Sequence, residues 1–381
     1  MMDAYITDLA SFLPGDPVAN EAIDSYLGQV DRLSSRTRAK ILASNGIQTR
    51  YYAIDPETGE PSHTNAQLTA EAVRRLAGAE GCLPACLACG TSSPDQLMPG
   101  HASMVHGELG GGPCEVISTA GICLSGVMAL KYGAMAVALG LAESAVTTGS
   151  ELASSYMRAD FFAHAGSKEA YDRGTETGHP AFSFEEQFLR WMLSDGAGAA
   201  LVKRQPRGPV SLRIDWIELS SQAHRLEACM YAGGRKKING RLTGWRELFR
   251  KEGDSGGILT VKQDAKLLNR EILPAMVGAC LPPIIAKHTL TPDQIDWFLP
   301  HYSSAYFREP LYGQLCDIGF PIPWERWFTN LSTRGNTGSA SFYIMLEELF
   351  HSGRLRQGDR ILAFVPESGR FAAGYLLLTV V

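Results

Sequence analysis

One cysteine of the chain lies at a predicted turn between a strand and a buried helix, a position in which a thiol can act as a nucleophile. Cys123 lies in the segment 117–140, between a β-branched run and a long run of small and apolar residues. This pattern predicts a strand, a sharp turn and a buried helix, with the thiol at the turn. A thiol in the first helical turn meets unpaired backbone N–H groups and the positive end of the helix dipole, which favour the nucleophilic thiolate. The alternative is an inert cysteine that packs as a small hydrophobic residue.

Two polar residues in the second half of the chain occupy comparable positions. His301 follows directly after a strand predicted at 297–300, and Asn336 lies in a turn of small residues that leads into a buried helix within 333–349. The second arrangement is similar in kind to that of Cys123, which indicates an internal duplication with one central helix in each half. Taken singly, each residue fits a structural role better, His301 as a strand-end histidine and Asn336 as a turn residue.

The elements that must position these residues alternate between strand and helix along the chain, which predicts an α/β protein. We expect strands at 4–13, 82–90, 114–119, 145–151, 195–202, 210–219, 297–300, 359–365 and 372–380. We expect helices at 20–30, 64–76, 101–109, 261–279 and 291–295, besides the two central ones. A polar insertion occupies 223–257, and an irregular aromatic and charged excursion at 154–189 is interpreted as a lid or a loop facing a second subunit.

Composition limits the classes of partner. A formal net charge of −5 offers no basic excess for nucleic acid or anionic lipid. The longest apolar run, 127–142, is too short to span a bilayer, and the first residues lack the pattern of a signal peptide. Eight cysteines without regular spacing predict reduced thiols, so we expect a cytoplasmic protein.

Three other motifs suggest functions that their position in the sequence excludes. Cys82, Cys86 and Cys89 form a C-x3-C-x2-C cluster, but the cluster lies in an apolar strand without a fourth ligand, so we expect no bound metal. The glycines at 110–112 precede a strand, whereas a phosphate-binding loop must follow one. The turn 121–126 is one residue too long for the nucleophile elbow of a hydrolase.

Four motifs taken together carry a named resemblance. They are Ala-Gly-Ile-Cys-Leu-Ser-Gly at 120–126, Asp-Gly-Ala-Gly-Ala-Ala at 195–200, Asp-Trp-Phe-Leu-Pro-His at 296–301 and Gly-Asn-Thr-Gly-Ser-Ala at 335–340. In this order and spacing, and with Asn-Gly-Ile-Gln-Thr-Arg at 45–50, they resemble the ketoacyl-acyl-carrier-protein synthase III type of condensing enzyme in the thiolase superfamily. The resemblance covers nearly the whole chain.

The resemblance implies a thiolase-like duplicated five-layer α-β-α-β-α fold, with one half at 1–205 and the other at 206–381. It also implies a homodimer, acyl-CoA or acyl-carrier-protein thioesters as substrates, no cofactor, and a catalytic triad of Cys123, His301 and Asn336. The chemistry suits these residue types, because a thiolate attacks an acyl thioester and two hydrogen-bond donors stabilise the enolate that forms next.

Departures from the family pattern refine the expectation. The usual His-Gln-Ala-Asn is replaced by His-Tyr-Ser-Ser at 301–304, and the glycine-rich terminal turn by Pro-Glu-Ser-Gly-Arg-Phe at 366–371. Glu367 and Ser368 are therefore candidates for orienting the second substrate. The segments 150–158 and 188–195 resemble the branch that makes dialkylresorcinol and stilbene precursors.

That branch implies that a cysteine-bound acyl group is joined to a β-ketoacyl thioester, with ring closure to a cyclohexanedione. A coupling without loss of CO₂ needs a base, and Glu151 is the candidate, with a structural turn residue as the alternative. The competing function is a decarboxylating 3-oxoacyl-ACP synthase III that uses malonyl-ACP, or a starter-unit acyltransferase of a polyketide pathway. A hydrolase and a catalytically silent partner subunit are the remaining alternatives.

Overall fold

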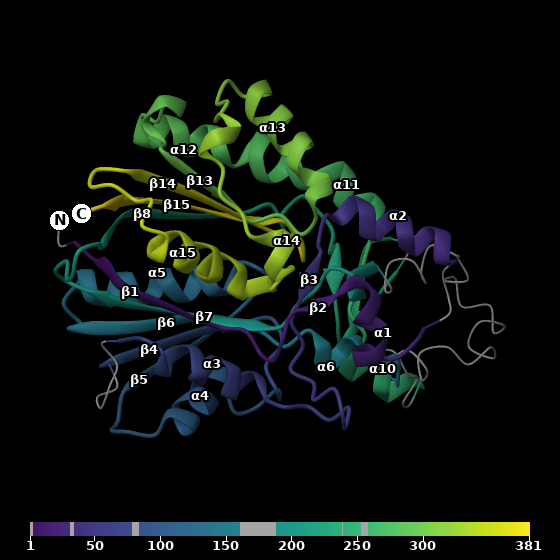
Figure 1. Cartoon of the computed structure of the whole chain (residues 1–381). Coiled ribbons are helices and arrows are strands. Elements are labelled where there is room, and N and C mark those ends of the chain that lie inside the picture. The colour runs from purple at the N-terminus through teal and green to yellow at the C-terminus, as the bar shows by residue number, and fades with distance from the viewer. Residues whose placement is uncertain (1–2, 31–33, 78–83, 161–187, 238, 253–257) are drawn as a thin grey trace.

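The protein is built around one continuous nine-stranded sheet that bends into two stretches (Figure 1). The computed structural model describes residues 3–30, 34–77, 84–160, 188–237, 239–252 and 258–381. In sheet order the strands are β13 (Trp297–Pro300), β14 (Arg360–Glu367), β15 (Ala372–Val380), β8 (Leu212–Ser221), β1 (Tyr5–Phe12), β7 (Gly196–Lys203), β6 (Ser144–Glu151), β4 (Cys86–Thr91) and β5 (Glu115–Ala120). The strands before and after residue 205 thus form separate stretches.

The two stretches meet at a short antiparallel pairing between β1 and β8. Only Tyr5 with Arg213 and Ile6 with Leu212 are in register there, whereas β1 pairs with β7 over almost its whole length. The sheet can therefore turn at this seam, and its two stretches lie one above the other (Figure 1).

Helices fill the space between the stretches and cover both outer faces, which gives the five layers expected of a thiolase-like fold (Figure 1). The helices α3 (Asn65–Arg74) and α4 (His101–Leu109) form the first layer. The central helices α5 (Ser125–Ala138) and α15 (Ser341–His351) lie between the stretches, and α11 (Ala265–Leu273), α12 (Leu281–His288) and α13 (Arg308–Asp317) form the last layer. The layer order predicted from the sequence is confirmed.

The central layer depends on glycines that let backbones approach closely. A Cβ atom at Gly126 in α5 or at Gly149 in β6 would overlap the main-chain carbonyl of Ser339, in the 3₁₀ turn (Gly338–Ala340) before α15. The Tyr343 hydroxyl, one turn into α15, donates to the Gly126 carbonyl oxygen at 2.9 Å. These contacts hold the segment before α15 against the amino-terminal half of the protein.

Most predicted elements form, with differences where proline and local pairing intervene. The helix expected at 261–279 begins only at Ala265, because Lys262 and Gln263 form strand β12 with β9 (Met230–Tyr231) and the Asp264 side chain caps the helix. A π-helical segment (Pro274–Ala279) then connects α11 to α12, so the helical region extends to residue 288.

Two predicted helices are shorter than expected. The helix at 20–30 is a 3₁₀ turn (Asn20–Ala22) followed by α1 (Ile23–Leu27), and that at 291–295 is a 3₁₀ turn (Pro292–Gln294). A further helix, α2 (Ser35–Asn45), is capped by Ser34 and leads into β3 (Thr49–Arg50).

The polar insertion at 223–257 is largely described by the structure, whereas the excursion at 154–189 is not. The insertion contains β9, β10 (Gly234–Lys236), β11 (Leu242–Gly244) and α10 (Trp245–Glu252). Most of the excursion lies outside the described residues, which retain α6 (Ser154–Met157) at its start. Among the helices that the model describes, none has the length and apolarity needed to cross a membrane.

Candidate functional site

Cys123 lies just outside the helix that it was expected to begin. The helix α5 starts at Ser125, Leu124 is its N-cap, and the Cys123 side chain is 9% exposed. Burial raises the pKa of the Cys123 thiol, and the nearby carboxylates of Glu151 and Glu367 raise it further. The prediction of a lowered thiol pKa is therefore wrong for the resting protein, because burial and the two carboxylates disfavour the thiolate.

Cys123 shares a small enclosed cavity with His301. The cavity measures about 40 Å³, which is room for one or a few water molecules. Its lining combines the polar side chains of Ser303 and Ser368 with apolar side chains from α11 and α13 and from the end of β14. Two residues that are distant in the sequence thus meet at one chamber, while an acyl chain would need the apolar side chains to move.

His301 follows β13 directly, as predicted, and its backbone N–H donates to the Phe364 carbonyl oxygen of β14 at 2.8 Å. The side chain is 4% exposed, and burial lowers the pKa of the imidazole to about 4. His301 is therefore neutral at physiological pH, so it can donate one hydrogen bond without carrying a charge.

Asn336 lies in a turn whose conformation is restrained by close packing and by hydrogen bonds to neighbouring residues. Gly335 has a φ of 70°, and a Cβ atom there would lie 2.9 Å from the Ser194 side chain, so only glycine fits. The Asn336 backbone bonds to Met192 and Ser194, and its side-chain oxygen accepts from the Gly338 N–H at 3.0 Å. Within the described residues, its amide NH₂ group makes no hydrogen bond. Asn336 is not part of the lining of the cavity that holds Cys123 and His301.

Glu151 at the end of β6 lies between the two halves of the site. The hydroxyls of Ser92 and Ser93 donate to its carboxylate at 2.6 and 2.5 Å, and the Ser339 N–H lies at 3.4 Å. Burial raises the pKa of the Glu151 carboxyl although these donors oppose the shift. Because Ser339 follows Asn336 closely, Glu151 ties the Asn336 turn to the strand end near Cys123.

Glu367 and Ser368 form the turn between β14 and β15. The Glu367 carboxylate accepts from the backbone N–H groups of Gly369 and Arg370, and burial raises the pKa of this carboxyl. The Ser368 hydroxyl accepts from the Gln263 amide at 3.1 Å and faces the cavity that holds Cys123.

Several residues that support the site carry no signal in the sequence. Ser92, Ser93, Ser339 and Gln263 reach it through contacts between elements distant in the sequence. The Asp195 carboxyl, which precedes β7, accepts from the backbone N–H groups of residues 53 and 154 and so ties both segments to the start of β7.

The structure offers no metal site among the residues that it describes. No group of three histidine, cysteine or acidic side chains there is arranged to hold an ion. Cys86 and Cys89 are buried in β4, and Cys82 lies outside the described residues.

Comparisons with known proteins agree with this architecture. Residues 285–378 match the family model for the carboxyl-terminal part of 3-oxoacyl-[acyl-carrier-protein] synthase III. A beta-ketoacyl-[acyl-carrier-protein] synthase III from Rhizorhabdus wittichii is 25% identical, with 98% of each chain covered.

Solved structures show the same fold over the whole chain. A variant of OleA from Xanthomonas campestris, with bound lauric acid and lauroyl-CoA, superposes with a TM-score of 0.75, 20% identity and 99% of each chain covered. The tetronic acid condensing enzyme AbyA1 gives a TM-score of 0.74, with 21% identity and 99% of each chain covered. The chain is thus an acyltransferase-type enzyme with a thiolase-like fold, and it is similar over nearly its whole length to a 3-oxoacyl-[acyl-carrier-protein] synthase III.

Proposed function

We propose that this enzyme transfers an acyl group to Cys123 and joins it to a β-ketoacyl thioester in a Claisen-type condensation. Ring closure then gives a cyclohexanedione, the precursor of a dialkylresorcinol or stilbene. The observation that supports the proposal is that Cys123 and His301 line one cavity, so that a thiol and a neutral imidazole share it. The acyl donor is a thioester of CoA or acyl carrier protein, and no cofactor takes part.

The first step exchanges one thioester for another. The Cys123 Sγ bonds to the acyl carbon, the C–S bond of the donor breaks, and the thiol proton passes to the leaving thiolate. Because the thiol has a raised pKa, it loses its proton only as the donor arrives. The neutral imidazole of His301 is available to relay that proton.

The second step develops negative charge on a thioester oxygen. His301 and the uncommitted NH₂ group of Asn336 are the donors that we assign to this enolate. Formation of the enolate without loss of CO₂ requires a base. The contacts of Glu151 to Ser92, Ser93 and Ser339 occupy both of its oxygens, which supports a positioning role for this carboxylate over that of the base.

The variant Glu151→Gln separates the two roles. Loss of condensation with unchanged acylation of Cys123 would identify Glu151 as the base, because the first step needs no carbanion. A positioning residue would slow both steps, since the Asn336 turn and the strand end near Cys123 would shift together.

Product analysis tests the reaction. The enzyme is incubated with a β-ketoacyl thioester and a 2-enoyl thioester in the absence of any malonyl donor. A cyclic dione is the expected product. Strict dependence on malonyl-ACP and release of CO₂ would instead establish the decarboxylating synthase or starter-unit acyltransferase.

Intact-protein mass spectrometry tests the nucleophile. We expect one acyl adduct on the wild type and none on Cys123→Ala. The exposed thiol of Cys316 provides the matched control, because Cys316→Ser should be acylated like the wild type. An adduct that persists on Cys123→Ala would disprove the assignment.

We also propose that the enzyme is a homodimer joined along β5. This strand is one of the two edge strands of the sheet, and exposed apolar side chains lie on α5 and in the turn after it, among them Met135, Leu139 and Leu141. An unpaired edge beside exposed apolar side chains favours pairing with a second copy about a two-fold axis. Light scattering should give the mass of a dimer for the wild type and of a monomer for Leu139→Lys.

None of the seven cysteines among the described residues forms a disulfide bond. Cysteines that are not joined in disulfides suit a reducing compartment, which supports the proposal that the enzyme acts in the cytoplasm.

A further inference from the structure

A second, larger cavity lies directly beside the chamber of Cys123. It is a groove of about 760 Å³ between the insertion and the turn that joins β14 to β15. Its wall includes Gly121 and Ile122, which immediately precede Cys123, and Glu367 and Gly369 from the turn. The groove therefore ends at the segment that carries the nucleophile.

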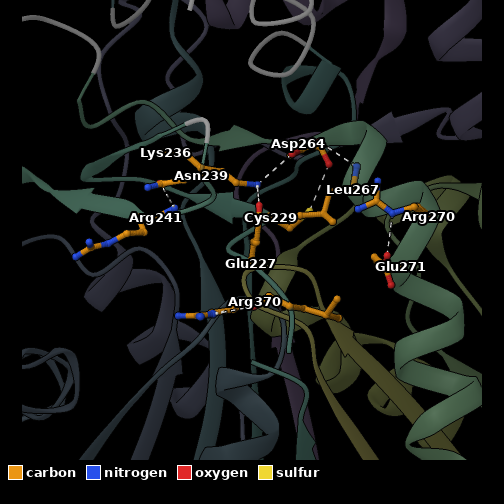
Figure 2. A network of polar contacts seen from close by, with 11 residues as sticks. Glu227, Cys229, Lys236, Asn239, Arg241, Asp264, Leu267, Arg270, Glu271 and Arg370 are labelled. Atoms are coloured by element: carbon orange, nitrogen blue, oxygen red, sulfur yellow. Dashed lines mark hydrogen bonds and ion pairs between the residues drawn. The ribbon is translucent and has the colours of Figure 1, made fainter. Parts of the chain in front are cut away.

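Three arginines make this groove basic. Arg225, Arg241 and Arg370 line it and are exposed, and Figure 2 shows the side chains of Arg241 and Arg370 extending to the same side. Arg370 donates to a backbone carbonyl oxygen at 3.1 Å, and Arg225 donates to the amide oxygen of Gln222 at 2.8 Å. Within the described part of the chain, none of the three is paired with a carboxylate.

The acidic residues of the groove do not cancel this charge. The Glu227 carboxylate lies 3.2 Å from the Lys236 ammonium, which also contacts Asp264 at 3.1 Å (Figure 2). The Glu367 carboxylate is buried and is held by backbone N–H groups of its own turn. The guanidinium groups of the arginines consequently remain available to an anion.

A thin partition separates the groove from the chamber. A Cβ atom at Gly369 would lie 2.8 Å from the Ile122 side chain, so the main chain at 369 is packed against Ile122. Cys123, which follows Ile122, and Ser368, which precedes Gly369, line the chamber instead. An acyl chain that reached from the chamber into the groove would need the Ile122 side chain to move.

We propose that the groove binds the carboxylate at the far end of the acyl group that Cys123 receives, so that the acyl donor is an ω-carboxyacyl thioester. A guanidinium group binds a carboxylate through two parallel hydrogen bonds, and three such groups face a space wide enough for a polar chain end. This inference rests on the proposed acylation of Cys123. The bonds made and broken are those of the thioester exchange, and the distal carboxylate stays unchanged.

The test compares matched thioesters on the full-length protein. Succinyl, glutaryl, adipyl and sebacyl thioesters are paired with neutral acyl thioesters of equal chain length, and Cys123 acylation is followed by intact mass. Each pair is prepared both on CoA and on pantetheine, which lacks phosphate. We expect at least one carboxylated member to react about tenfold faster than its neutral partner on both carriers, the size of one charge-assisted hydrogen bond.

Variants connect the preference to the groove. Arg370→Gln and Arg241→Gln should each reduce the ratio of carboxylated to neutral acylation about tenfold. The matched control is Arg270→Gln, because Arg270 is an exposed arginine on α11 that pairs with Glu271 outside the groove (Figure 2). Raised ionic strength should lower the ratio for the wild type, since salt screens exposed charges.

The outcomes separate this inference from the proposed function. Equal rates for carboxylated and neutral donors would overturn the inference, because the groove would then not recognise the carboxylate. An effect of the arginine variants seen only with CoA donors would also overturn it, because the arginines would then bind the phosphates of the carrier. Absence of any Cys123 adduct with every donor would overturn the proposed acylation itself.

Discussion

Acid should destabilise this fold through two buried histidines. His101 begins α4 and is 3% exposed, with its Nε2 atom near the hydroxyls of Thr69 and Ser150, and His301 is equally enclosed. Burial lowers the pKa of each imidazole to about 4, against about 6.5 in the unfolded chain. The folded state thus binds fewer protons, so the free energy of unfolding falls as the pH drops from about 6.5 towards 4.

The size of the effect follows from the two pKa values. At about pH 5 an unfolded imidazole is almost fully protonated and a folded one is almost neutral, which costs the folded state about 2 kcal/mol for each histidine relative to about pH 8. Buried carboxyls shift the balance in the opposite direction, because burial raises the pKa of Asp195 to about 6, so the total pH dependence does not isolate the histidines.

Comparison with a variant isolates one of them. Urea unfolding of the wild type and of His101→Gln is measured at several pH values between about 8 and 5. The carboxyls are common to both proteins, so the free energy of unfolding should fall by about 2 kcal/mol less in the variant. The same replacement at the exposed His224 provides the matched control. Parallel pH curves for wild type and His101→Gln would refute the reasoning.

Three further predictions concern packing and capping. Gly149→Ala should lower the free energy of unfolding by about 1–3 kcal/mol, because the added methyl group overlaps the Ser339 carbonyl, whereas Gly107→Ala in α4 meets no atom and should be neutral or stabilising; thermal denaturation of both variants checks this. Thr64→Ala should cost about 1 kcal/mol, because Thr64 forms a capping box at the start of α3, and chemical denaturation would contradict this if the midpoint did not move. Tyr343→Phe should cost about 1–2 kcal/mol through loss of the bond to the Gly126 carbonyl, and calorimetry showing an unchanged melting temperature would exclude that contribution.

Local patterns were sufficient for most of the fold. The helices α3 and α4 begin within one residue of their predicted starts, since a capping threonine and the residues after a proline-glycine pair mark them. The start of α11 was misplaced, because the extended conformation of Lys262 is set by pairing with β9, which periodicity cannot reveal.

The local positions of the candidate site residues could be predicted from the sequence, and their electrostatics could not. The small-residue turns around Cys123 and Asn336 and the strand end before His301 are visible in the sequence. The raised pKa of the Cys123 thiol is not, because it arises from enclosure by side chains distant in the chain and from two carboxylates that folding brings near.

The short pairing between β1 and β8 indicates that the connectivity of the polypeptide could be changed by circular permutation. The Ala4 carbonyl oxygen accepts from the Ile214 N–H, and the Val381 N–H donates to the Ser211 carbonyl oxygen. The first and last strands of the chain, β1 and β15, are therefore anchored on opposite sides of β8, both near its start. A short linker from residue 381 to residue 4, with a new opening in the exposed turn near residue 206, would exchange the order of the two halves. Such a circular permutant should assemble the same layers, since no strand would have to leave its neighbours.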